Sequence, residues 1–145
     1  MADTVLALRL PPTFESVDKA RAAVRELCRG RYRGPGAEDL LGDLLLAITE
    51  AMNNAVEHSR AAEMEIDVVA GERSLTFRLL TAGEPFDPTV GASFPDLDGP
   101  GGLPEGGFGR ALVAALVDRV TYGYREGRNV LALEKRLTRE VGDGE

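Results

Sequence analysis

Apolar residues recur at helical spacing through residues 40–59, and this stretch is the centre of the pattern. They fall on one side of a helical wheel: Leu41, Leu44, Leu45, Ile48, Ala51, Met52, Ala55 and Val56. The other side carries mainly polar residues: Asp43, Ala47, Glu50, Asn54, Glu57 and His58. Glu50 and Asn54 are four residues apart, so their side chains lie one turn apart on the same face. The pattern predicts a long helix with one buried and one polar face.

The polar face has two interpretations. Acidic and amide residues opposite an apolar face usually form a solvated surface. Asn53 and Asn54, however, lie well inside the helix, where Asn is a poor helix former that competes for backbone hydrogen bonds. This cost favours a use for the amide, while the pattern alone leaves both interpretations open.

The flanking segments predict strands and further helices. Residues 4–10 alternate weakly before Pro11 and Pro12, which indicates an edge strand. Ser16 is the expected cap of a helix that reaches Cys28 and ends at Gly30. Residues 64–70 and 74–80 are typical of a hairpin, as are residues 120–124 and 129–135. Between the hairpins, a helix begins in the glycines near residue 107, with Leu112, Val113, Leu116 and Val117 on its buried side.

Residues 81–107 are so rich in proline and glycine that no regular element is expected there. A loop of this length is usually a linker or a functional lid, and its position before a helix favours a lid over residues 82–106. We expect residues 141–145 to be a disordered tail. The whole chain, residues 1–145, then forms a single α/β (α+β) two-layer sandwich, with a mixed, mostly antiparallel sheet covered on one face by helices.

Composition narrows the function. A net charge of −7 over 145 residues argues against nucleic acid or an anionic membrane as a partner. The single cysteine, Cys28, has no internal disulfide partner and is expected in the core. The start of the chain lacks the features of a signal peptide, and no apolar run approaches the roughly 20 residues that span a bilayer. We expect a cytoplasmic protein.

Gly107, Phe108 and Gly109 at a helix start are a candidate phosphate cradle, because glycines allow close backbone approach and the helix N-terminus favours anions. Such a glycine pair is weak evidence by itself. It gains weight from Glu50 and Asn54 and from the glycine turn at Gly83. The chain has no P-loop, no cysteine–histidine metal spacing and one histidine, so serine-type and zinc-type hydrolysis have little support.

The segment EAMNNAVEH, residues 50–58, resembles the E-x-x-x-N segment of the ATPase superfamily shared by gyrase, the ninety-kilodalton heat-shock chaperone, histidine kinases and the MutL repair protein. The turn GEPFDP, residues 83–88, and the ending VTYGYREGRNVLALEKRL are similar to the anti-sigma-factor serine/threonine kinases of bacterial partner-switching systems. The resemblance covers nearly the whole chain and implies a Bergerat-type ATP-binding fold.

The resemblance implies a role for each matching residue. Asn54 would hold Mg²⁺ beside the ATP phosphates, and Glu50 would be the general base for the incoming hydroxyl. His58 would pack or donate a hydrogen bond at the nucleotide site. Gly83 would let the backbone approach adenine.

Gly107, Phe108 and Gly109 would cradle the phosphates as the lid closes. Arg110 follows them where the family usually has an aliphatic residue, and it is either a phosphate contact or a solvated helix arginine.

One position departs from the family pattern. The motif that ends at Gly83 normally reads D-x-G, and its Asp accepts a hydrogen bond from the adenine amino group; here Thr81 takes that place. A Thr hydroxyl can accept the bond but carries no charge.

Two main hypotheses follow. The first is an Mg-ATP-dependent serine/threonine kinase, a homodimer by resemblance, that phosphorylates an anti-sigma-factor antagonist of the STAS type and regulates a sigma factor. The alternative is a degenerate, weakly ATP-binding partner module without kinase activity. A stand-alone ATP hydrolase or sensor-kinase fragment has less support, since no phosphoacceptor-histidine helix precedes the domain.

Overall fold

The computed structural model describes residues 3–85 and 107–138, without the side chains of residues 3 and 107–111. Its elements in chain order are β1 (Asp3–Leu10), α1 (Phe14–Arg31), α2 (Ala37–His58), β2 (Met64–Ala70), β3 (Ser74–Ala82), α3 (Gly107–Leu116), β4 (Arg119–Arg125) and β5 (Arg128–Arg136). The predicted helices, hairpins and first strand are all confirmed, with ends that shift by a few residues. Most of the predicted lid and the whole predicted tail lie outside the described residues.

The five strands form one sheet in the order β1-β2-β3-β5-β4, so the predicted edge position of β1 is confirmed. Every pairing among the described strands is antiparallel, where a mixed, mostly antiparallel sheet was expected. Tight turns make the β2–β3 and β4–β5 pairs antiparallel. Two successive helices separate β1 from β2, and together they bring the chain back to the end of the sheet where β1 finishes. β2 begins there and runs antiparallel to β1.

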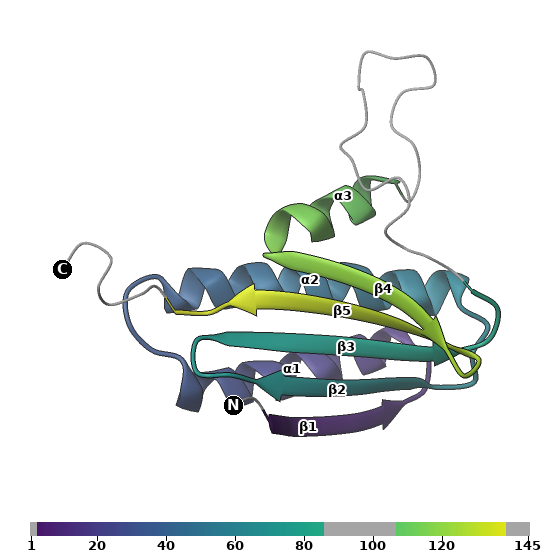
Figure 1. Ribbon diagram of the computed structural model, residues 1–145, viewed down its shortest axis with the longest axis horizontal. Coiled ribbons are helices and arrows are strands. Elements are labelled where there is room, and N and C mark those ends of the chain that lie inside the picture. Colours follow the sequence, from purple (N-terminus) through teal and green to yellow (C-terminus); the bar gives the residue numbers. More distant parts are fainter. Residues whose placement is uncertain (1–2, 86–106, 139–145) are drawn as a thin grey trace, which may run out of the picture.

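The sheet and two helices form the two predicted layers. Figure 1 shows α1 and α2 behind the sheet, and α3 above α2 on the β4 side. In β2, β3 and β5 every second residue is buried and faces the helices. The core includes fully buried side chains from both layers, among them Leu44, Ile48, Met52, Phe77 and Leu133. The candidate site lies at the polar end of this core, where helix α2 and strand β3 both end.

Two details of the helices differ from expectation. Thr13, not Ser16, caps α1: its Oγ1 accepts the Ser16 N–H at 3.2 Å, and the helix continues past Gly30 to Arg31. Ala47 was expected on the polar face of α2 but is fully buried. Because α3 packs against α2, the buried part of α2 is wider than its periodicity indicates. Within the described residues, no helix is long and apolar enough to cross a membrane.

Candidate functional site

Glu50 and Asn54 lie on the last three turns of α2, and both are half-buried. Within the described part of the chain, neither side chain makes a hydrogen bond or an ion pair. Polar groups that are partly removed from water normally find partners. These two side chains are therefore open to water or to a ligand.

Asn54 shares a small cavity of about 30 Å³ with Thr81. The cavity lies between the end of α2 and strands β3, β4 and β5, and its lining combines apolar and polar side chains: Ala51, Asn54, Ala55, Ser59, Leu79, Thr81, Tyr122, Asn129 and Leu131. The structure thus brings together the predicted magnesium ligand and the residue in the predicted adenine-reading position. They come from elements that are distant in the sequence.

Thr81 is 8 % exposed, and its hydroxyl has no hydrogen-bond partner among the described residues. The hydroxyl oxygen is not among the described side-chain atoms that are buried without a partner, so it is open to the two cavities that Thr81 lines. A ligand there can bond to the hydroxyl in place of water. The residues present therefore suit a polar ligand at this point.

Asn129 lies directly opposite Thr81 in the β3–β5 pairing and is 9 % exposed. Its Nδ2 donates to the main-chain oxygen of Glu84 at 2.9 Å and approaches that of Thr81 at 3.4 Å, while its Oδ1 accepts from the Tyr122 hydroxyl. Asn129 therefore fixes the turn that follows β3. Sequence reasoning missed it, although an Asn in the buried register of a strand, two residues before Leu131, is a usable signal.

The Gly83 turn is held by two more bonds. The Gly83 N–H donates to the Gly127 oxygen at 3.0 Å, and the Gly83 oxygen accepts from the Tyr124 hydroxyl at 2.7 Å. Gly83 has φ of 132°, a conformation that other residues rarely adopt. The predicted glycine turn is therefore a defined structural feature, anchored to the β4–β5 hairpin.

A larger cavity of about 720 Å³ adjoins the small one. The two share Ser59, Thr81 and Asn129, and the larger is lined in full by His58, Ser59, Arg60, Thr81, Ala82, Gly83, Glu84, Pro85, Tyr124, Gly127 and Asn129. The predicted residues His58 and Gly83 thus lie at the same opening as Thr81. His58 is half-exposed, with its Nε2 3.8 Å from the Glu57 carboxylate.

The other predicted residues are Glu50 and residues 107–110. Glu50 is not among the described residues that line either cavity, and it lies one turn before Asn54. Helix α3 begins at Gly107 as expected, but the side chains of Phe108 and Arg110 lie outside the description. The phosphate-cradle role of residues 107–110 stays a prediction.

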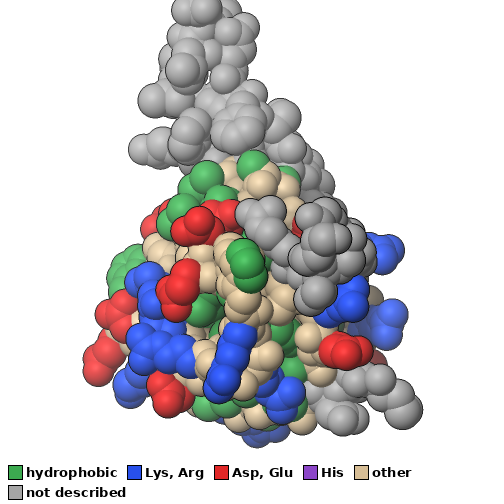
Figure 2. Space-filling view, turned by 90° about the vertical axis from the view of Figure 1, so that its left-hand side faces the viewer, with side chains coloured by type: hydrophobic (Ala, Val, Ile, Leu, Met, Phe, Trp, Pro, Cys, Tyr) green, Lys and Arg blue, Asp and Glu red, His purple; other side chains and the backbone are tan. Residues whose placement is uncertain are grey.

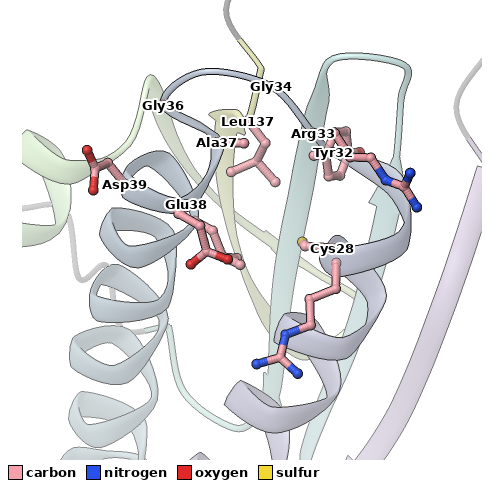
Figure 3. Close-up of a pocket in the computed structure, with 11 residues that line it drawn as sticks. Cys28, Tyr32, Arg33, Gly34, Gly36, Ala37, Glu38, Asp39 and Leu137 are labelled. Atoms are coloured by element: carbon pink, nitrogen blue, oxygen red, sulfur yellow. The ribbon is translucent and has the colours of Figure 1, made fainter.

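A third cavity, of about 480 Å³, opens at the far end of α2. Figure 3 shows it between the end of α1 and the start of α2, with Glu38 turned towards the opening. Burial raises the pKa of the Cys28 thiol there to about 11, so the thiol stays protonated and is a poor nucleophile. Figure 2, which views this end, shows cationic and anionic side chains intermixed. The 1.5 Å helix rise puts Asn54 about 25 Å from Ala37, so this cavity is separate from the candidate site.

The profile of the histidine kinase-like ATPase domain matches residues 10–135. This chain belongs to that family.

Relatives of this histidine kinase-like ATPase domain agree with the assignment. The serine-protein kinase RsbW of Staphylococcus epidermidis is 28 % identical over 149 residues, which cover 93 % of this chain and 88 % of the relative. RsbW sequences from two strains of the same species match with the same figures.

The crystal structure of the RsbU and RsbW domains of Rv1364c from Mycobacterium tuberculosis superimposes with a TM-score of 0.62 at 22 % identity. The match covers 94 % of this chain and 34 % of that one, so this chain spans about a third of its length. That likeness concerns the fold. The family predicted from residues 50–58 and from the end of the chain is confirmed, and so is the ATPase-type fold.

Proposed function

We propose that this histidine kinase-like ATPase domain is a serine/threonine protein kinase that uses Mg²⁺-ATP to phosphorylate an anti-sigma-factor antagonist with a STAS-type domain, and that it thereby regulates a sigma factor. One observation carries the proposal: Asn54 and Thr81, from α2 and β3, line one cavity with side chains that are unengaged by described residues. The kinase name of the RsbW relatives supports the reaction type.

The donors present suit the proposed ligands. Mg²⁺ prefers a few oxygen ligands together with phosphate and water, and the Asn54 amide supplies such an oxygen. The Thr81 hydroxyl both donates and accepts, so it can bond to the edge of a purine. Bound Mg²⁺-ATP supplies the transferable phosphoryl group and the cation that neutralises its charge.

The chain's own residues supply the rest of the proposed mechanism. The Glu50 carboxylate, one turn before Asn54, accepts the proton of the incoming serine or threonine hydroxyl at a side-chain oxygen. Main-chain N–H groups at the start of α3 would hold the phosphates, because the helix dipole favours anions there. Gly83, held in its turn by Gly127 and Tyr124, lets the backbone lie close to the base.

We also infer, from the family resemblance, a cytoplasmic homodimer that binds the antagonist and the sigma factor in alternation. The net charge of −7 favours protein partners over nucleic acid.

The test is phosphoryl transfer from γ-labelled Mg-ATP to purified STAS-type domains encoded in the same genome, with mass spectrometry to locate phosphoserine or phosphothreonine. We expect one such domain to be labelled by the wild-type protein and not by the Glu50→Gln variant. Binding of a STAS-type domain without transfer, together with ATP affinity too weak to measure, would instead identify a degenerate binding module.

A further inference from the structure

Lys135 of β5 is a buried lysine, 7 % exposed, to which the proposed mechanism gives no role. Its Nζ donates to the main-chain oxygen of Leu116 at 2.7 Å and lies 3.7 Å from an oxygen of the Asp43 carboxylate. Lysine is almost never buried without such partners. Through one ammonium group, Lys135 therefore connects β5, α3 and α2.

Leu116 is the last residue of α3, so its carbonyl is one of those that a helix leaves without an internal partner. A cation at this end also opposes the partial negative charge of the helix C-terminus. Next to it, the Asp118 N–H donates to the Glu134 oxygen at 2.9 Å, and the Asp118 carboxylate accepts the Arg136 N–H at 2.6 Å. The C-terminal end of α3 is thus fixed to β5.

Among the described residues, the Lys135 bond is the side-chain hydrogen bond that joins α3 to the sheet. The other end of α3 begins at Gly107, in the proposed phosphate cradle. A helix of 10 residues is roughly 15 Å long, so a tilt of roughly 5° about the Leu116 end moves the Gly107 end by about 1 Å. Displacements of this size impair phosphate positioning and transfer.

The second partner of Lys135, the Asp43 carboxylate, relates the C-terminal end of α3 to α2. Asp43 lies on α2 seven residues before Glu50, which is two helical turns, and both residues are on the same face as Asn54. The ammonium group therefore sets the position of α3 relative to the face of α2 that carries the proposed base and magnesium ligand.

We infer that Lys135 is a positioning residue for the triphosphate: by capping the C-terminus of α3 against β5 and Asp43, it fixes where the opposite end of α3 meets the phosphates. This inference takes its ligand, ATP, from the proposed function. The contacts of Lys135 with Leu116 and Asp43 do not depend on that function. Base recognition at Thr81 lies on β3 and is independent of α3.

The test compares Lys135→Met, which keeps the length and removes the charge, with Val24→Ala, which destabilises the buried face of α1 away from α3. Calorimetry measures Mg-ATP and adenosine binding, since adenosine lacks the phosphates. We expect Lys135→Met to weaken ATP binding about tenfold and adenosine binding less than about twofold. We expect Val24→Ala to alter neither at a temperature where both variants are folded.

Hydrogen exchange of the ligand-free protein tests the anchor without any nucleotide. Lys135→Met should speed amide exchange in residues 112–116 relative to the sheet, and Val24→Ala should not. Unchanged exchange in α3, or equal losses of ATP and adenosine affinity, would overturn the inference. A wild-type protein that binds neither ligand would reject the proposed function, and the exchange result would still decide the anchor. If Lys135→Met does not fold, Asp43→Asn, at a half-exposed position, replaces it. This variant should weaken ATP binding about twofold, leave adenosine binding unchanged and speed amide exchange in residues 112–116.

Discussion

Thr81 and Asn129 face each other across the β3–β5 pair, and each is less than one-tenth exposed. Asn129 uses its amide to hold the turn after β3, whereas the Thr81 hydroxyl has no partner in the described part of the chain. The family motif places a carboxylate where Thr81 stands. The structure therefore has an uncharged pair at the proposed base end of the site, and one member of that pair has a structural role.

Replacing Asn129 tests that structural role. Asn129→Ala removes the bond from Asn129 to the main-chain oxygen of Glu84 and the bond that the Asn129 side chain accepts from the Tyr122 hydroxyl. We expect a loss of about 1–3 kcal/mol in urea denaturation, with weaker ATP binding. The matched control is Tyr124→Phe, which removes an exposed bond to the Gly83 oxygen and should cost less than about 1 kcal/mol. Equal losses for both variants would show that Asn129 has no special role in the turn.

The magnesium assignment is tested at Asn54, with its neighbour as control. Asn54→Ala should weaken Mg-ATP binding strongly while leaving thermal stability unchanged or slightly raised, because Ala is the better helix former. Asn53→Ala, also half-buried on α2 but absent from the cavity lining, should leave ATP binding unchanged. Calorimetry with and without Mg²⁺ measures the difference. Equal ATP affinity in wild type and Asn54→Ala contradicts the assignment.

The general-base assignment is tested by removing proton acceptance alone. Glu50→Gln keeps the shape of the side chain, so ATP affinity should be roughly kept while single-turnover phosphoryl transfer falls by about 10²–10⁴. Glu57→Gln, at an exposed position two turns further along α2, should transfer at the wild-type rate. A wild-type rate in Glu50→Gln would mean that another group accepts the proton.

Alkaline pH should destabilise the fold through Cys28. Burial raises the pKa of this thiol from 9.0 to about 11 in the folded chain, partly offset by Arg31, so the thiol's contribution to stability is complete below pH 9. As pH rises from 9 to 11, the unfolded chain ionises first and the free energy of unfolding falls by about 2 kcal/mol. The pKa of Tyr32 is also raised, mainly by burial and in part by the charge of the Cys28 thiolate, so Cys28→Ala removes the thiol's own effect together with that smaller part of the Tyr32 shift. Urea denaturation should therefore show a steeper decline between pH 9 and 11 in wild type than in Cys28→Ala; identical slopes would contradict this.

Local patterns were enough to predict much of the fold. The apolar spacing of α2 depends on residues three and four apart, and the existence of this helix and the shared face of Glu50 and Asn54 follow from that spacing. The bounds of β2 were also predicted correctly, because alternation and a short turn define them locally. The adenine-binding roles of Thr81 and Gly83 come from the family resemblance and stay predictions.

Features that depend on distant partners could not be predicted in this way. Ala47 is buried because α3 packs against α2, which no window around residue 47 contains. Asn129 and Lys135 occupy buried strand positions because their partners are carbonyls of Glu84 and Leu116, supplied by other parts of the fold. The order β3-β5-β4 likewise depends on pairing between strands that are not consecutive.

The central claim is that ATP binds across the two adjoining cavities that share Thr81, with Thr81 at the base end and Asn54 in the smaller cavity, and calorimetric titration of three proteins tests it most directly. Wild type should bind ATP weakly, in the micromolar range. Thr81→Val, which removes a hydroxyl without a partner, should be at least as stable and bind ATP less tightly.

A hydrogen bond to a charged group contributes roughly 1.5–3 kcal/mol, against about 0.5–1.5 for a neutral one, so Thr81→Asp should bind ATP about five- to thirtyfold more tightly and improve ATP over GTP. The titrations are made at about 0.15 M salt, where repulsion between the new carboxylate and the phosphates is screened. Identical ATP and GTP affinities in all three proteins, or no ATP binding in any of them, would contradict the claim.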